Sequence, residues 1–217
     1  MVMAIKLPPY MPAWTLKNII ERFGKPLVFA LSLLPLLRLI WLGTHNQLSA
    51  NPVEFITRFT GTWGIVFLCL TLAITPLRIA TSWNFLLKFR RMLGLFCFFY
   101  ACLHFLTWFV IDQQFDIQAI YQDFYKRTFI TLGLFAFILL IPLAITSTKG
   151  MQKKLGRSWV KLHSLIYLIA ILVMLHYYVH KAAKNNFGEV RVYIAILSLL
   201  LAWRLIRWSL KKFALKT

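Results

Sequence analysis

The chain has 217 residues, 60% of them hydrophobic, and a mean hydropathy of +0.70. Soluble domains are about 45–50% apolar, so this composition excludes an ordinary soluble domain and predicts an integral membrane protein. The formal charge of +19 lies in short segments between apolar runs, which is typical of membrane flanks and excludes an extended nucleic-acid-binding face.

Six apolar runs are long enough to approach or match the roughly 20 residues that cross a membrane as a helix. The predicted spans are residues 27–43, 61–80, 93–111, 129–147, 162–179 and 191–208. The expected fold class is therefore all-α, a six-transmembrane-helix bundle that forms a single domain over residues 1–217. Residues 1–25 are expected to form a cytoplasmic N-terminal segment, and the protein as a whole is expected to contact membrane lipid.

Basic residues are distributed unevenly between the two sides of this arrangement. Eighteen of the 25 Lys and Arg residues lie before the first span, at or after the end of the last, or at the span ends and loops that join spans two and three and spans four and five. Because Lys and Arg are enriched in cytoplasmic loops, both termini are predicted to be cytoplasmic. Five of the six acidic residues fall on the opposite side, which agrees with this orientation.

The segment between spans three and four, residues 112–128, is too polar to cross a membrane. Its apolar residues recur at near-helical spacing, for example Ile117, Ile120, Tyr121 and Phe124. We expect a short helix that lies on the outer membrane surface or covers a site there.

Histidines are the residues inside the spans that can carry chemistry, since no Asp or Glu lies within any predicted span. His104 in span three lies about twelve residues, or roughly 18 Å, from the cytoplasmic start of that span, and His176 in span five lies at a similar depth. Two neutral imidazoles at one depth on neighbouring helices can bind one haem iron from opposite sides. A lone histidine in an apolar helix is otherwise a hydrogen-bonded structural residue.

The other three histidines lack such a match. His163 lies near the cytoplasmic end of span five and has no histidine partner at its level, although Met92 is a thioether near the start of span three. His45 and His180 fall at or beyond the outer ends of spans, where a solvated interfacial role is expected.

Several segments resemble a known family. They are RRMLGLFCFFYACLH (90–104), ITSTKGMQKKLGRSWVKLHSLIYLIAILVMLHYY (145–178), TGTWG (60–64) and LAITPLR (72–78). They are similar to the haem-binding membrane subunits of bacterial periplasmic protein-methionine-sulfoxide reductase systems, which belong to the ferric-reductase-like transmembrane domains. The resemblance covers most of residues 55–180.

The resemblance implies a six-helix cytochrome of the bacterial inner membrane that holds b-type haem and FMN. It also implies a non-catalytic electron-transfer role, with electrons passing to a periplasmic molybdenum-containing partner that reduces methionine sulfoxide in proteins. The family's haem histidines match His104, His163 and His176. Ferric reductases with two bis-histidine haems carry an earlier histidine on span three, where this chain has Arg90 and Arg91. A second haem therefore stays an open expectation.

Three arginines have alternative interpretations. Arg90 and Arg91 are either topology anchors at a cytoplasmic helix start or, given the resemblance, a clamp for a flavin phosphate or a haem propionate. Arg38 lies well inside span one, where an arginine is usually paired or extends its side chain toward the interface. We expect it to face a propionate of the outer haem.

The sequence contains no Gly-rich dinucleotide-binding turn, so the electron donor is expected to be separate, either a cytosolic flavin reductase or a membrane quinol. Two alternatives remain open at this point. One is a haem-binding subunit of a different ferric or quinone-linked reductase, and the other is a haem-free permease or scaffold.

Overall fold

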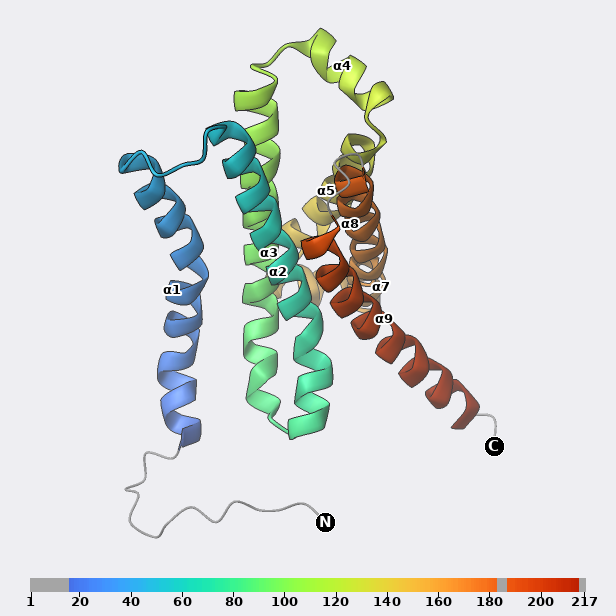
Figure 1. Cartoon of the computed structure of the whole chain (residues 1–217). Coiled ribbons are helices and arrows are strands. Elements are labelled where there is room, and N and C mark those ends of the chain that lie inside the picture. Colours follow the sequence, from blue (N-terminus) through green and yellow to red (C-terminus); the bar gives the residue numbers. More distant parts are fainter. Residues whose placement is uncertain (1–15, 183–186, 215–217) are drawn as a thin grey trace.

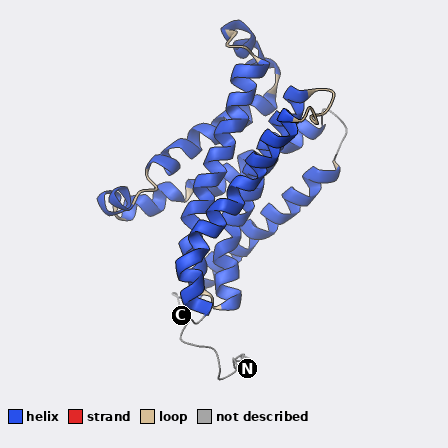
Figure 2. Cartoon of the chain, turned by 90° about the vertical axis from the view of Figure 1, so that its left-hand side faces the viewer, coloured by secondary structure: helices blue, strands red, loops and turns tan. Residues whose placement is uncertain are grey.

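The computed structural model describes residues 16–182 and 187–214, and every regular element in these residues is helical (Figures 1 and 2). The elements are α1 (Leu16–Thr44), α2 (Pro52–Thr81), η1 (Asn84–Leu86), α3 (Leu87–Leu106), the π-helix η2 (Thr107–Asp112), α4 (Ile117–Lys126), α5 (Thr128–Ile145), α6 (Lys149–Leu155), α7 (Arg157–His163), α8 (Leu165–Ala182) and α9 (Gly188–Ala214). The all-α prediction is confirmed. Most of the predicted N-terminal segment, residues 1–15, lies outside the described residues.

Within the described residues, five helical stretches are long and apolar enough to cross a membrane: Arg22–Thr44, Pro52–Thr81, Asn84–Asp112, Thr128–Ile145 and Arg157–Ala182. They correspond to the first five predicted spans. The sixth predicted span, 191–208, lies within the 27-residue helix α9, which is not among the five. Four basic residues occupy the second half of α9, and charged side chains are costly in hydrocarbon.

Helix α2 begins at Pro52, well before the predicted start of span two at residue 61. The Asn51 side chain caps this end, because its Oδ1 accepts a hydrogen bond from the Glu54 N–H at 3.1 Å, and Pro52 occupies the first helical turn. An Asn cap followed by Pro is a strong start signal that does not depend on hydrophobicity. The helix therefore begins about two and a half turns before the predicted span.

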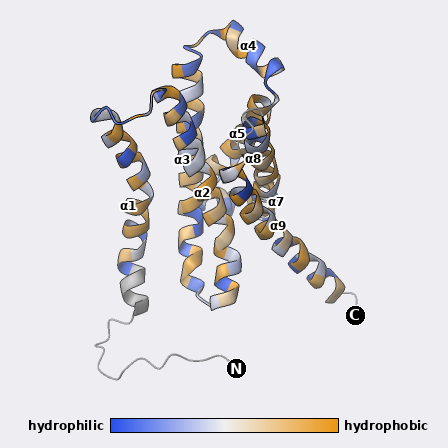
Figure 3. Cartoon of the chain, in the orientation of Figure 1, coloured by the Kyte–Doolittle hydropathy of each residue, from blue (hydrophilic) through white to orange (hydrophobic). Residues whose placement is uncertain are grey.

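The bundle is built from two closely packed helix pairs, α2 with α3 and α5 with α8, and the two pairs face one another through α3 and α5. Helix α9 packs across α2 and α8, and α1 contacts the bundle through α3 (Figure 1). The buried centre includes Leu68, Tyr100, Ile169 and Leu197, all under 2% exposed. Many large apolar side chains lie instead on the outer surface, where lipid is their expected solvent. Figure 3 shows that hydrophobic residues recur along the long helices.

At two of the prolines inside spanning helices, Pro35 and Pro76, side chains from other helices satisfy the affected backbone. Pro76 has no N–H for the carbonyl of Leu72 one turn earlier, and the Arg204 Nη2 on α9 donates to that carbonyl at 2.6 Å. Beside Pro35 in α1, the Tyr100 hydroxyl donates to the Ser32 carbonyl at 2.9 Å and accepts from the Leu36 N–H at 3.2 Å. The prolines are thus points at which α1 and α9 are joined to the bundle.

The segment between α3 and α5 forms helix α4, as the spacing of its apolar residues predicted, and it lies across the end of the bundle (Figure 1). Asp116 caps it by accepting hydrogen bonds from the N–H groups of Gln118 and Ala119. Ile117, Tyr121 and Tyr125 are each more than 60% exposed. Because they are four residues apart, they form one apolar face of α4 that is directed away from the rest of the chain.

Candidate functional site

His104 on α3 and His176 on α8 meet in the space between the two helix pairs. Their ring centroids are 6.1 Å apart and their planes are nearly perpendicular, at 83°. A metal–imidazole bond is about 2 Å long and the ring centre lies about 1 Å beyond the bonded nitrogen, so one metal ion between two imidazoles separates the ring centres by roughly 6 Å. The prediction that these two histidines lie at one depth on neighbouring helices is in agreement with this geometry.

Both histidines are held in the same way. His104 Nδ1 donates to the backbone carbonyl of Thr57 at 2.8 Å, and His176 Nδ1 donates to the carbonyl of Phe129 at 2.6 Å, each carbonyl lying 47 residues earlier in the chain. A neutral imidazole that donates from Nδ1 keeps a free electron pair on Nε2. A carbonyl bond of this kind fixes both the tautomer and the ring orientation of a metal-binding histidine.

A cavity of about 420 Å³ surrounds the two rings. Its walls are mostly apolar and come from both helix pairs, with Ile65, Leu68, Phe105 and Phe137 among the lining residues. That volume lies within the range of roughly 300–1,000 Å³ that is typical of cofactor sites. A flat, largely hydrophobic group can therefore occupy the space between the histidines.

Three basic side chains line the cavity: Arg58, Arg127 and Lys181. Lys181 is only 3% exposed, and its Nζ lies 3.8 Å from the Glu189 carboxylate on α9. Glu189 also lies 4.0 Å from Arg58, and Arg127 pairs with Asp123 at 3.2 Å. This part of the cavity can accept the negatively charged edge of a ligand whose remainder is apolar.

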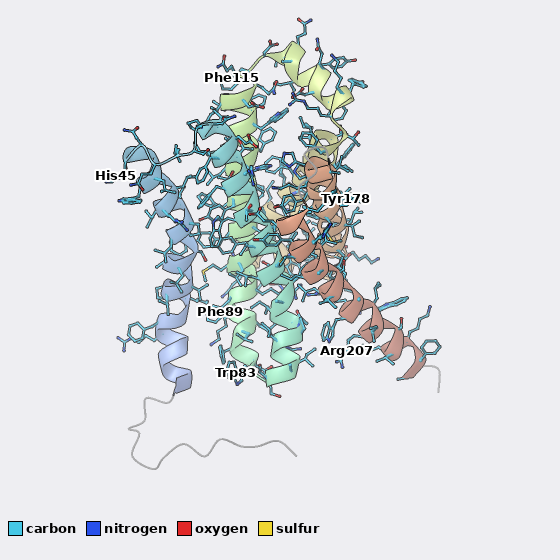
Figure 4. The ribbon with its side chains drawn as sticks, in the orientation of Figure 1. His45, Trp83, Phe89, Phe115, Tyr178 and Arg207 are labelled. Atoms are coloured by element: carbon cyan, nitrogen blue, oxygen red, sulfur yellow. The ribbon has the colours of Figure 1, made fainter. Side chains whose placement is uncertain are left out.

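His180 also lines the cavity, with its ring 5.1 Å from that of Phe129, although a solvated interfacial position was expected for it. His45 lies at the end of α1, away from the cavity (Figure 4). Its Nδ1 is 2.9 Å from the Trp41 carbonyl, and its ring packs against that of Trp41.

The structure separates the remaining predicted site residues from this cavity. Arg38 is exposed on α1 and is not among the cavity-lining residues, and in the described residues its helix contacts the bundle chiefly through α3. Arg38 is therefore not placed beside the two histidines, and its contact with a cofactor stays a prediction. Arg90 and Arg91 are exposed in the first turns of α3, about 20 Å along the helix from His104.

His163 is also outside the cavity, at the end of α7. Its Nε2 lies 3.1 Å from the Thr146 hydroxyl, and its ring stacks on Trp159 with centroids 3.9 Å apart. The Trp159 Nε1 donates to the Thr146 carbonyl at 2.9 Å. Histidine, tryptophan and threonine thus join α7 to the end of α5, and no second histidine faces His163 in the described residues.

The chemistry of the donor set fits a haem better than a bare metal ion. No group of three or more His, Cys, Asp or Glu that could hold a metal occurs in the described residues. A haem needs only two protein ligands, because its porphyrin supplies the other four. Two neutral imidazoles, apolar walls and a basic cavity edge match the iron, the ring and the propionates respectively.

The comparisons with known proteins agree with this fold. Residues 60–174 match the family described as "Ferric reductase like transmembrane component". The match covers more than half of the chain, so the chain belongs to the ferric-reductase-like transmembrane family.

Similar proteins define the subgroup. "Protein-methionine-sulfoxide reductase heme-binding subunit MsrQ" of Ralstonia nicotianae is 48% identical, over 91% of this chain and 89% of its own length. The proteins of the same name from Herminiimonas arsenicoxydans and Bordetella pertussis are 52% and 50% identical, over 87% and 85% of this chain. The chain belongs to the MsrQ family. No solved structure matches it.

Sequence reasoning identified both facing histidines and missed the residues that hold them. No sequence pattern marks the carbonyls of Thr57 and Phe129, because every residue carries a backbone carbonyl. Nothing in the sequence marks Lys181 as buried, because its burial depends on the position of Glu189 on another helix.

Proposed function

We propose that this chain is the haem-binding subunit of a protein-methionine-sulfoxide reductase system, and that His104 and His176 bind one b-type haem. The observation that carries the proposal is the pair of rings 6.1 Å apart in an apolar cavity, each with Nδ1 bonded to a backbone carbonyl. The names of the similar proteins support it. When bound, the haem supplies a one-electron carrier.

The residues of the cavity have distinct roles in this proposal. The carbonyls of Thr57 and Phe129 keep both imidazoles neutral and oriented, so that each presents Nε2 to the iron. The apolar walls exclude water and favour a low-dielectric site around the ring. Arg58, Arg127 and Lys181 would hold the propionates of a bound haem, the role that Arg38 was expected to have.

The proposed orientation places both termini in the cytoplasm and the cavity near the periplasmic face of the bacterial inner membrane. Helix α9 is then a sixth span, with its basic second half at the cytoplasmic side. The cavity is near the end of the bundle that α4 crosses. An electron leaving for a periplasmic partner, proposed to be a molybdenum-containing methionine-sulfoxide reductase, thus departs from the correct side.

An absorption spectrum of the purified protein, oxidised and then reduced, tests the haem proposal. We expect a low-spin haem spectrum in the wild-type protein. His104→Ala and His176→Ala should each abolish it or convert it to a five-coordinate spectrum, and each should block reduction of the partner. His45→Ala is the matched control and should leave the spectrum unchanged. A full bis-imidazole spectrum in His104→Ala would contradict the proposal.

Electrons are proposed to enter from a cytosolic flavin reductase or a membrane quinol, through FMN bound near Arg90 and Arg91. The exposed arginines at the start of α3 can bind a phosphate from the cytoplasmic side. Replacing both with Gln should release FMN while the haem spectrum is retained. Retention of FMN at wild-type occupancy would identify these arginines as topology residues instead.

His163 is proposed to belong to the same cytoplasmic-side region, either as a ligand of a second haem or as a contact of the flavin. The two roles differ in measurable composition. Loss of haem per protein in His163→Ala indicates a ligand, and loss of FMN alone indicates a flavin contact. Unchanged haem and FMN would leave His163 as a structural residue that joins α7 to α5 through Thr146.

A further inference from the structure

Each of the two facing histidines lies directly against a glycine of the helix that also provides its carbonyl. A Cβ atom at Gly61 of α2 would lie 2.9 Å from His104 Nδ1 and 3.0 Å from its Cε1. A Cβ atom at Gly133 of α5 would lie 2.7 Å and 2.9 Å from the same two atoms of His176. Carbon atoms in favourable contact are about 3.5–4.0 Å apart, so neither ring can keep its position beside an alanine.

The two arrangements have the same register. Gly61 follows Thr57 by about one helical turn, and Gly133 follows Phe129 by the same interval. In each helix pair the carbonyl binds Nδ1 and the glycine beyond it leaves room for the face of the ring. The same pair of groups, a carbonyl that accepts from Nδ1 and a glycine four residues later, thus contacts an imidazole once on α2 and once on α5.

Other glycines in the helices do not have such close neighbours. A Cβ atom at Gly94 on α3 would meet its nearest atom, Thr71 Cγ2, at 3.6 Å, and one at Gly43 would meet Leu48 Cδ1 at 3.9 Å. These are ordinary van der Waals distances. Among the glycines of the described residues, only Gly61 and Gly133 thus lie in such tight contact with a ring.

We propose that Gly61 and Gly133 are positioning residues for the haem ligands, and that each sets the location and plane of one axial imidazole. This inference rests on the proposed haem function. An added methyl group forces the ring either to leave the carbonyl or to move its Nε2 away from the iron. Disturbing the groups that orient a metal ligand typically costs roughly 10- to 100-fold in affinity.

The nearly perpendicular ring planes, at 83°, provide a spectroscopic signature. Two axial imidazoles with perpendicular planes give low-spin ferric haem a strongly anisotropic electron paramagnetic resonance signal, whereas parallel planes give a less anisotropic one. We expect the strongly anisotropic signal in the wild-type protein. A ring displaced by an added methyl group should change that anisotropy or yield high-spin haem.

The experiment compares Gly61→Ala and Gly133→Ala with Gly94→Ala in the full-length protein. The first two should lower haem affinity roughly 10- to 100-fold and alter the resonance signal. Gly94→Ala should retain both, since alanine has the higher helix propensity and its Cβ makes only ordinary van der Waals contact with Thr71. If Gly61→Ala and Gly133→Ala both keep wild-type affinity and signal, the glycine inference is wrong while the haem proposal stands.

A double-mutant cycle separates ring positioning from general helix packing. Gly61→Ala should lower the thermal midpoint of the haem-free protein when His104 is present and should not lower it in a His104→Ala background. An equal loss in both backgrounds would show that Gly61 serves helix packing and would overturn the inference. A wild-type protein without low-spin haem would overturn both this inference and the proposed function.

Discussion

Arg204 is a charged residue within a predicted span, and its side chain has a specific partner there. Its guanidinium donates to the Leu72 carbonyl at 2.6 Å and lies 5.3 Å from the Tyr167 ring centre. The carbonyl is available because Pro76 cannot donate to it. Burying the Arg204 charge and leaving the Leu72 carbonyl unpaired would each be unfavourable, and the hydrogen bond between them reduces both penalties.

Replacing Arg204 with Ala should destabilise the protein by about 1–3 kcal/mol, because it leaves a buried carbonyl unsatisfied. Thermal unfolding in detergent measures the change. Arg207→Ala is the control, since Arg207 is exposed on the same helix. In a Pro76→Ala background, where residue 76 can donate to Leu72, the cost of Arg204→Ala should be smaller. An equal cost in both backgrounds would contradict this account of the hydrogen bond.

Helix α1 is joined to the other helices by few contacts, and one of them is polar. The Tyr100 hydroxyl bridges Ser32 and Leu36 on α1, next to Pro35, while Tyr100 itself is fully buried. The Phe29 and Phe96 rings, 5.3 Å apart, add an apolar contact between α1 and α3. The Tyr100 hydroxyl thus adds a polar attachment to the apolar contacts that α1 makes with the core through Val28, Leu33 and Leu36.

Tyr100→Phe should weaken the attachment of α1, because the Leu36 N–H and the Ser32 carbonyl lose their shared partner. Amide hydrogen exchange should become faster in α1 around Pro35 and stay unchanged in α5 and α8. Tyr178→Phe, at a side chain that is 48% exposed, is the control. Unchanged exchange in α1 would mean that apolar contacts alone hold this helix.

At the scale of the whole molecule, the positive-inside rule and the position of the cavity lead to the same orientation. The segments rich in Lys and Arg are the ones proposed to face the cytoplasm. His104 and His176 both lie toward the ends of α3 and α8 that are far from these basic segments. The redox site is therefore proposed to lie on the periplasmic side, where the reductase partner is expected.

Reporter fusions test this orientation together with the sixth span. A reporter that is active only in the periplasm should be silent after Thr217 and active when inserted after Gln122 in α4 or after Ala182 at the end of α8. Activity after both Ala182 and Thr217 would show that α9 does not cross the membrane. Activity after Thr217 with silence after Gln122 would reverse the orientation and place the cavity at the cytoplasmic face.

The sequence by itself determined the helical membrane class, the first five spans and the two histidines of the cavity. These follow from apolar run length and from helical rise, which are local properties of the chain. It did not determine the true start of α2, which depends on the Asn51 cap, or the exclusion of Arg38 from the cavity, which depends on how α1 packs.

Only the tertiary structure decided what surrounds each histidine. The carbonyls of Thr57 and Phe129 and the glycines at 61 and 133 lie more than 40 residues from the rings that they contact. Their roles arise when α2 packs on α3 and α5 packs on α8. Neither a backbone carbonyl nor a glycine changes the composition or the hydrophobic periodicity of a sequence in a way that predicts this role. Both act only where two helices approach closely.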